Sequence, residues 1–238
     1  MRLITFLLSM LMLVSTLPAL AKEGHEFNDL YRVTLLRAAP GEFSRLLADM
    51  QNKSKRGNYH ILRHSQGDHW DLMTIEHWGS YSAWFDPANP KRQTQDKSWR
   101  EHLDRLSSYR SEWFAYGPDK SVIEQGVHNN DLYHVEMFRA LAGHKIKLLH
   151  QRAIENDYLQ QTGQVVNVVF KGDQGTDWDV MTIGFHKSLL SFAKGSDLSV
   201  DEKDKIAKHV GFKGVADIGP YLRSLLASHN DTLAVSVK

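Results

Sequence analysis

The sequence contains no cysteine among its 238 residues, which excludes disulfide bonds, thiolate zinc sites, thiol nucleophiles and iron–sulfur clusters. It also has almost no net charge, because 29 Lys and Arg residues are balanced by 28 Asp and Glu residues. A protein that binds nucleic acid by neutralising phosphates needs a basic face, so we expect no nucleic-acid partner. With 42% apolar and 24% charged residues, the composition is that of an ordinary globular protein.

Several catalytic signatures are also missing from the sequence. We find no Gly-x-Ser-x-Gly, no His-Glu-x-x-His, no phosphate-binding loop and no Gly-x-Gly-x-x-Gly after the first expected strand. These absences argue against serine hydrolases, zinc peptidases and nucleotide-dependent enzymes. What the sequence has in excess is histidine, with 13 residues. The sequence does not name a reaction, and whether the protein is an enzyme stays open.

The first residues have the pattern of a secretory signal peptide. Arg2 precedes an apolar run over residues 3–17, and Pro18-Ala19-Leu20-Ala21 supplies an Ala-x-Ala cleavage site. An uncleaved membrane anchor is the alternative, but the run of about 15 residues is shorter than the roughly 20 that cross a bilayer. We therefore expect a signal peptide over 1–21, cut after Ala21. The mature protein would be periplasmic or secreted and would have no membrane association.

The rest of the chain contains an internal repeat. Residues 30–38 match residues 132–140 at an offset of 102, beginning with Leu-Tyr in both copies. Residues 70–75 match residues 178–183 at an offset of 108, with the sequences Trp-Asp-Leu-Met-Thr-Ile and Trp-Asp-Val-Met-Thr-Ile. A repeat of this length is a domain rather than a solenoid unit. We expect one repeat over 22–127 and a second over 128–238.

Apolar periodicity and turn residues predict the same element order in both repeats. In the first repeat the expected elements are strand 30–37, a helix that opens at 40–42, strands 58–64 and 70–78, helix 97–112, and a closing strand from 113–117 and 121–124. In the second they are strand 132–139, helix 143–157, strands 164–171 and 177–186, a helix capped by Ser199 and Glu202, a helix from Gly219, and strand 232–237. Each order is βαββαβ, the ferredoxin-like arrangement.

Two such repeats, with their Tyr-x-Val first strands and Trp-Asp third strands, resemble the dimeric α/β-barrel superfamily. The resemblance implies an α+β fold in which two tandem ferredoxin-like repeats set their antiparallel sheets face to face. Superfamily members are usually homodimers, so the fused chain would be a monomer or a weak homodimer. The superfamily includes cofactor-free monooxygenases, haem-binding proteins, isomerases, cyclases and small-ligand sensors. The fold alone therefore does not choose a function.

Strand alternation sorts the side chains into two faces. We expect one face to pack on helices, with Met73, Ile75, Met181 and Ile183 on the third strands and Tyr133, Val135 and Met137 on the first strand of the second repeat. The other face would line a cavity between the two sheets, with Arg32, Glu76, His134, Glu136 and His186.

Imidazoles and carboxylates in such a cavity support three interpretations. Glu76, His134, Glu136 and His186 are candidate catalytic acids or bases. The same groups could ligate a metal, although we assign no metal ligand. They could also form a polar cluster that only stabilises the fold.

Aromatic and basic residues are candidate ligand contacts. Trp70, Trp78 and Trp178 could stack on a planar ligand, and Arg32, Arg37 and Arg139 could bind an anionic group. The aromatic segment 78–87, which we match to nothing in the second repeat, is either a lid or plain packing. Asp71 and Asp179 are interpreted as residues that bond backbone amides at hairpin starts.

These features favour an exported barrel protein that binds a small, apolar or aromatic ligand between its two sheets. The alternatives are a cofactor-free oxygenase, isomerase or lyase with a His or Glu base, and a haem- or metal-binding barrel. We expect no cofactor, with haem and a divalent metal as the alternatives.

Overall fold

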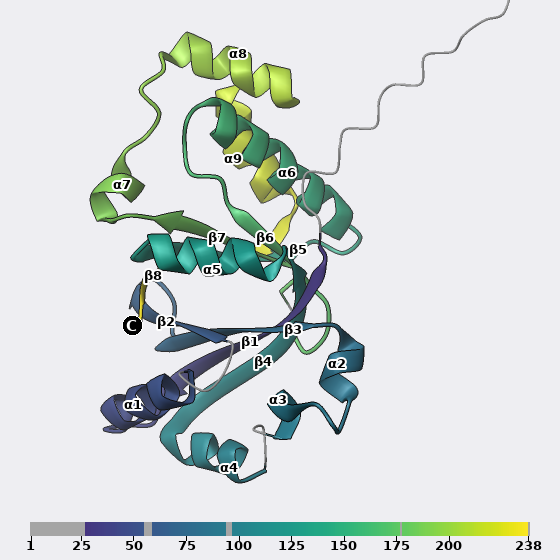
Figure 1. Ribbon diagram of the computed structural model, residues 1–238. Helices are drawn as coiled ribbons and strands as arrows, with labels where there is room; N and C mark the ends of the chain where they lie inside the picture. Colours follow the sequence, from purple (N-terminus) through teal and green to yellow (C-terminus); the bar gives the residue numbers. More distant parts are fainter. Residues whose placement is uncertain (1–26, 55–58, 94–96, 177, 238) are drawn as a thin grey trace, which may run out of the picture.

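The computed structural model describes residues 27–54, 59–93, 97–176 and 178–237, so the expected signal peptide lies outside the described part. In these residues eight antiparallel strands form one sheet that closes on itself (Figure 1). Around the sheet they follow the order β1 (Asp29–Ala38), β3 (Leu72–Gly79), β2 (Tyr59–Gln66), β8 (Leu226–Ser236), β5 (Leu132–Ala140), β7 (Val180–His186), β6 (Val168–Gly172) and β4 (Ser107–Gly117). The α+β class with an antiparallel sheet is thus confirmed.

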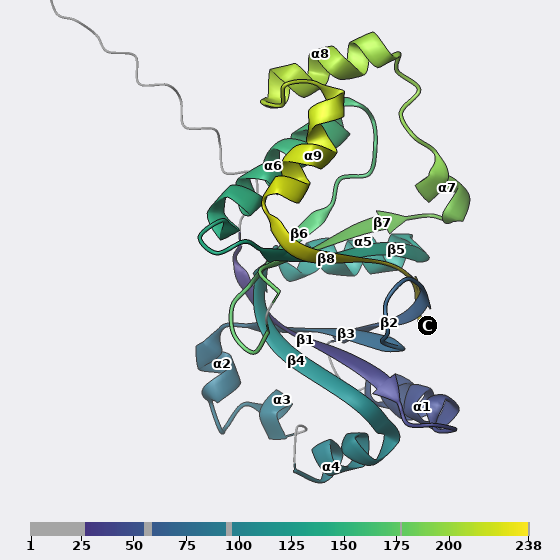
Figure 2. The ribbon, with the colours of Figure 1, turned by 180° about the vertical axis from the view of Figure 1, so that it is seen from behind.

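The helices lie outside the sheet in two groups. The first group covers β1 to β4 and contains α1 (Phe43–Ser54), α2 (Tyr81–Phe85), α3 (Pro90–Gln93) and α4 (Lys97–Leu106). The second group covers β5 to β8 and contains α6 (Lys145–Gln161), α7 (Leu189–Ala193), α8 (Val200–Val210) and α9 (Ile218–Ser224), with a 3₁₀ turn at Val215–Asp217 (Figure 2). No helix in the described ranges has both the length and the apolar character needed to cross a bilayer.

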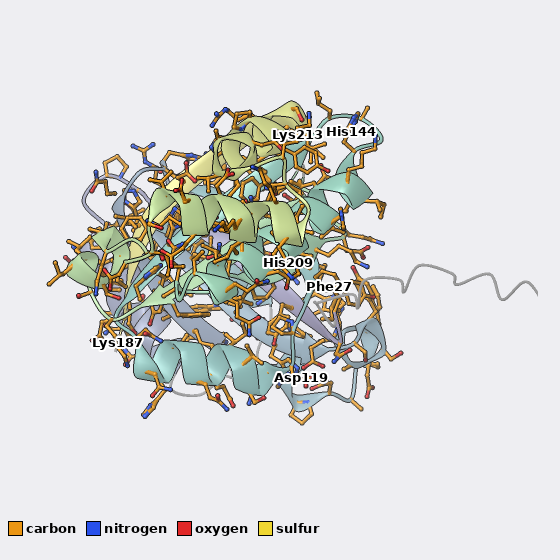
Figure 3. The ribbon with its side chains drawn as sticks, turned by 90° about the horizontal axis from the view of Figure 1, so that it is seen from above. Phe27, Asp119, His144, Lys187, His209 and Lys213 are labelled. Atoms are coloured by element: carbon orange, nitrogen blue, oxygen red, sulfur yellow. The ribbon has the colours of Figure 1, made fainter. Side chains whose placement is uncertain are left out.

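Helix α5 (Lys120–Asn129) connects the two halves and packs against the main core. Its buried Ile123 belongs to the same apolar cluster as the barrel strands, and Val127 packs against that cluster. Figure 3 shows α5 with Asp119 and Lys187 near its two ends. One tyrosine from each half anchors this connection, because the Tyr31 hydroxyl donates to the Pro118 carbonyl at 2.7 Å and the Tyr133 hydroxyl to the Asn130 carbonyl at 3.1 Å.

The largest apolar cluster fills the space inside the closed sheet. Its members come from both halves and alternate along their strands, among them Tyr31, Val33, Met73, Ile75, Trp113, Tyr133, Val135, Met137, Phe170, Met181 and Ile183. Tyr31 and Phe170 meet edge to face, with ring centroids 5.3 Å apart. The two halves therefore share one core.

This core corrects the predicted assignment of faces. Met73, Ile75, Met181, Ile183, Tyr133, Val135 and Met137 were expected to face helices, and instead they face the barrel interior. The expected polar side chains lie on the outer face, beneath the helices. The assignment failed because a closed sheet has an apolar interior of its own, so alternation alone does not tell which side holds the helices.

Element boundaries differ from the prediction in both halves. In the second half the closing strand expected over 232–237 begins at Leu226, and the strand expected over 164–171 begins at Val168. The helix expected over 97–112 ends at Leu106, and β4 begins at Ser107. Residues 121–124, expected as strand, belong to α5. In the second half the capping box is confirmed, because the Ser199 hydroxyl accepts from the Glu202 amide and the Glu202 carboxylate accepts from the Ser199 amide.

Candidate functional site

Arg32 and Glu76 form an ion pair on the outer face of β1 and β3. The two residues are register partners, and Arg32 Nη2 lies 2.7 Å from Glu76 Oε2. Their side chains are only 11% and 7% exposed. The indole Nε1 of Trp78 donates to the same oxygen at 2.9 Å. Glu76 Oε2 is therefore occupied by two donors and is held as an acceptor.

A cavity of about 20 Å³ adjoins this pair between the sheet and helices α1 and α4, and it has room for about one water. The strands contribute Arg32, Thr34, Leu36, Tyr59, Thr74, Glu76, Arg110 and Glu112, and the helices contribute Met50, Trp99, Arg100 and Leu103. Four charged residues line the sheet side, and Arg100 of α4 adds a further charge from the helix side. The cavity is thus small, enclosed and strongly polar on one side.

Within the described part of the chain, two buried polar atoms of cavity residues have no hydrogen-bond partner: Arg32 Nε and the Tyr59 hydroxyl. Burial first, and the nearby Glu76 carboxylate second, raise the pKa of Tyr59 well above its usual value. The phenol is therefore protonated at neutral pH and can donate. Because an unsatisfied buried donor is costly, two such donors in residues that line one cavity indicate a site for an acceptor atom.

The short helix after β3 covers Arg32. Trp84 of α2 lies with its ring centroid 5.2 Å from the Arg32 guanidinium carbon, and it packs edge to face on Trp78 at 4.6 Å. The second half has an equivalent arrangement. His134 of β5 corresponds to Arg32 of β1, and the Phe192 ring of α7 lies 5.1 Å from the His134 ring. Ser80 and Ser188 cap α2 and α7 in the same way. The expectation that segment 78–87 lacks a counterpart was therefore wrong.

In the second half the space between sheet and helix is occupied by a buried arginine. Arg152 of α6 is 2% exposed, its Nη1 lies 3.8 Å from Glu136 Oε2, and it also pairs with Glu155. Thr182 donates to Glu136 Oε2 at 2.9 Å. Burial raises the pKa of Glu155, against the opposing effect of Arg152. Thr182 and Arg152 therefore hold Glu136 beneath α6, with the guanidinium shared between Glu136 and Glu155.

His134 and His186 lie side by side under Phe192 on the outer face of β5 and β7. The His186 ring lies 5.2 Å from Phe192, and its buried Nδ1 has no partner. Burial first and the neighbouring His134 second lower the pKa of His186, so it is neutral at pH 7. In the position of Glu76 the second half has Gly184, whose added Cβ would come within 3.0 Å of His186 Nε2.

The predicted site residues therefore do not converge in one cavity. Arg32 and Glu76 lie on β1 and β3, whereas His134, Glu136 and His186 lie on β5 and β7, on the opposite side of the closed sheet. The expected cavity between the sheets is filled by the apolar core instead. Convergence was wrong because it depended on the reversed face assignment.

The candidate ligand contacts also separate. Trp78 supports Glu76, while Trp70 is fully buried in the barrel core and Trp178 packs against that core. Arg37 and Arg139 are exposed at strand ends. The interpretation of the repeated aspartates is confirmed, because Asp71 accepts from the Ala38 amide at 2.7 Å and Asp179 from the Ala140 amide at 2.9 Å.

The sequence did not predict the roles of Tyr59 and Arg152. Tyr59 contributes a buried hydroxyl to the cavity beside Arg32 and Glu76, and Arg152 fills the space beside Glu136. Tyr59 begins β2, where apolar and polar residues alternate only weakly. The sequence therefore does not indicate that its hydroxyl is buried. Arg152 lies on a helix, where a charged residue is usually exposed. Its place between Glu136 and Glu155 follows from three-dimensional packing alone.

Comparisons with known proteins give the fold. No protein-family model matches the chain, and no curated protein matches it by sequence. An anthrone oxidase-like protein of known structure is similar with a TM-score of 0.61 at 13% identity, covering 89% of this chain and 92% of that one. A Fusobacterium nucleatum protein named provisionally as a monooxygenase has a TM-score of 0.54 at 8% identity, with 88% and 93% covered. At these identities the likeness shows a shared fold.

Proposed function

We propose that the protein binds a small ligand with an apolar or aromatic body and an acceptor oxygen, in the cavity between the outer face of β1–β3 and helices α1 and α4. The observation that carries this proposal is the pair of partner-free buried donors, Arg32 Nε and the Tyr59 hydroxyl, in residues that line one cavity. An oxygen accepting from both would remove their desolvation cost. Met50, Leu103 and Trp99 would contact the apolar body.

A ligand larger than one water has to displace part of the cavity wall. Trp99 and Arg100 are the outer part of that wall on α4, and both are more exposed than the buried Leu103. Lys53 lies 4.8 Å from the Trp99 ring, and His102 stacks on it at 5.5 Å. Movement of this indole would admit a planar ligand without disturbing Leu103 or Leu106, which anchor α4 in its apolar cluster.

Binding is better supported than base catalysis by Glu76. A general base needs an oxygen that can reach the proton of a substrate, and Glu76 Oε2 already accepts from Trp78 and pairs with Arg32. The carboxylate therefore acts first to hold Arg32 in place. Arg32 and Tyr59 are the groups that would contact the ligand.

Ligand binding is tested by quenching of tryptophan fluorescence with 2-naphthol and, as the probe without an acceptor oxygen, 2-methylnaphthalene. We expect 2-naphthol to bind more tightly. Tyr59→Phe should lower its affinity by about 2- to 12-fold, which corresponds to a hydrogen bond of roughly 0.5–1.5 kcal/mol. Tyr109→Phe, at an exposed tyrosine of β4, is the matched control. Equal affinity for both probes, or an equal effect of both variants, would refute the proposal.

A cofactor-free oxygenase working in the same cavity is the second candidate. It is favoured by the oxidase and monooxygenase names of the two fold neighbours. Oxygen uptake in the presence of anthrone tests it, with Tyr59→Phe and Tyr109→Phe as the variant and its control. Uptake that depends on Tyr59 supports catalysis, and its absence leaves the binding function.

We also propose that the chain is exported after cleavage behind Ala21 and that it arose by duplication, with ferredoxin-like repeats over 22–127 and 128–238. The duplication is supported by strand order, which is β4-β1-β3-β2 in one half and β8-β5-β7-β6 in the other. Export is tested by N-terminal sequencing of the protein from the periplasm of a bacterial host, where the chain should begin at Lys22. A chain that retains Arg2 would contradict it.

A further inference from the structure

Three side chains on the outer face of the second half have the composition of a metal site. His134 and Glu136 come from β5 and Asp231 comes from β8, and one ligand atom from each lies within 4.8 Å of the other two. We propose that these residues bind a divalent first-row transition metal ion, with zinc as the representative. The site lies on the opposite side of the closed sheet from the Arg32–Glu76 cavity, so the two proposals are independent.

Strand register creates this group. Residues 134 and 136 alternate onto the same face of β5, and Glu136 is the direct cross-strand partner of Asp231. Like charges opposite each other in an antiparallel pair destabilise a sheet. A cation between the two carboxylates would reverse this effect, so the pairing itself indicates a place for positive charge.

Arg152 supplies only part of that charge. Its Nη1 lies 3.8 Å from Glu136 Oε2, while its Nη2 pairs with Glu155 and its Nε donates to Gln151 at 2.7 Å. The guanidinium is therefore shared between two carboxylates, and it approaches Glu136 from α6. Asp231, whose side chain is 53% exposed, is contacted by His134 at 3.9 Å and His229 at 3.3 Å.

The donor set selects the class of ion. One imidazole nitrogen and two carboxylate oxygens suit borderline divalent ions such as zinc and cobalt, whereas magnesium and calcium prefer oxygen alone. Bonds of about 2.0–2.2 Å put two ligands of one ion at most about 4.4 Å apart. The separation of His134 Nε2 and Asp231 Oδ1, 3.9 Å, already lies inside this limit.

The surroundings fit an ion that is reached from one side. Phe192 covers His134 with an apolar ring at 5.1 Å. On the other side, an open surface pocket of about 360 Å³ is lined by Gly67, Asp68, His69, Asn230 and Asp231. An ion and its remaining water ligands could thus enter through this pocket and past Asp231.

Metal binding to the full chain tests this proposal. After treatment with a chelator and its removal, the chain is titrated with Zn²⁺ by calorimetry and with Co²⁺ by visible absorption. We expect one ion per chain and a higher melting temperature in its presence. His134→Ala and Asp231→Asn should each lower the affinity at least tenfold, while His209→Ala, at an exposed position on α8, should bind as the parent chain does (Figure 3).

Glu136→Gln distinguishes loss of a metal ligand from loss of folding, because it keeps the size of the side chain and its contact with Thr182. A folded Glu136→Gln chain, verified by circular dichroism, with weakened binding supports the site. Unchanged stoichiometry and affinity in His134→Ala, Asp231→Asn and Glu136→Gln would overturn it, as would failure of the parent chain to bind either ion.

Discussion

Arg32 and Glu76 face each other across the β1–β3 ladder and meet at 2.7 Å, beneath the Trp84 ring. Because both charges are buried, removal of one leaves the other uncompensated. We expect Glu76→Gln to lower the free energy of unfolding by about 3–5 kcal/mol in urea titrations.

The exposed pair Lys97–Glu101, 3.6 Å apart on α4, is the matched control. Glu101→Gln should cost less than about 1 kcal/mol. The double variant Arg32→Leu/Glu76→Leu should be more stable than Glu76→Gln, because it leaves no unpaired buried charge. Equal losses of unfolding free energy in Glu76→Gln and Glu101→Gln would show that the buried Arg32–Glu76 pair contributes no more than an exposed ion pair.

Stability should decrease in mild acid because of two half-buried histidines. Burial lowers the pKa of His60 and of His186 below that of an unfolded histidine, about 6.5. The unfolded chain therefore binds protons first as the pH falls below about 7, and this favours unfolding until the folded-state pKa values are passed.

The expected result is a melting temperature that falls between pH 7.5 and pH 5.5 in the parent chain and falls less in His60→Gln/His186→Gln. His209→Gln, at an exposed helix position, should follow the parent chain. Parallel curves for the parent and the double variant would exclude these two histidines as the cause.

Gly67 lets the β2–β3 turn approach β8. Its φ is +123°, and an added Cβ would lie 2.2 Å from the Asp231 carbonyl oxygen. Gly41 also has a positive φ, +84°, but an added Cβ would have no atom within 4 Å. Gly41→Ala should thus show only the conformational cost of roughly 1–2 kcal/mol. Gly67→Ala should lower the free energy of unfolding clearly more than Gly41→Ala does, as measured by urea titration. Similar free energies for the two variants would show that the turn can move away from β8 at little cost.

Neither half should be stable as a separate monomer. The shared core places Phe170 against Tyr31, and the edge strands β2 and β4 of one half pair with β8 and β6 of the other. Residues 22–127 expressed alone should unfold or associate with themselves in light scattering, while the full chain should be a monomer. A folded, monomeric half would contradict the proposed fused pair.

The sequence allowed the strands and their order to be predicted, because the repeat places matching strand patterns in both halves. It did not reveal which face is inside. Tyr133, Val135 and Met137 alternate with His134 and Glu136 in the same way whether the apolar face meets helices or a barrel interior. The end of α4 was predicted too late, because Leu103, Leu106 and Trp113 have helical spacing. The helix ends at Leu106, since the residues from Ser107 onward pair with β1 as strand β4.

The candidate site residues were correctly predicted to share one face of their strands, but their convergence in one cavity was wrong. Arg32, Glu76, His134 and Glu136 were identified correctly as polar residues sharing one face, since alternation is a local property. Their division between two sites depends on where the sheet closes, and Tyr59, Arg152 and Asp231 join them only through packing and register between distant segments.

Gly184 takes the position in the second half that Glu76 takes in the first, and a Cβ added there would lie 2.7 Å from Asn167 Oδ1 and 3.0 Å from His186 Nε2. In a dimer of identical chains, every substitution appears at both sites at once, so the two sites cannot specialise. A chain that carries both halves is released from that symmetry. One side could then keep an arginine–glutamate cavity for an organic ligand while the other gained histidines for a different task.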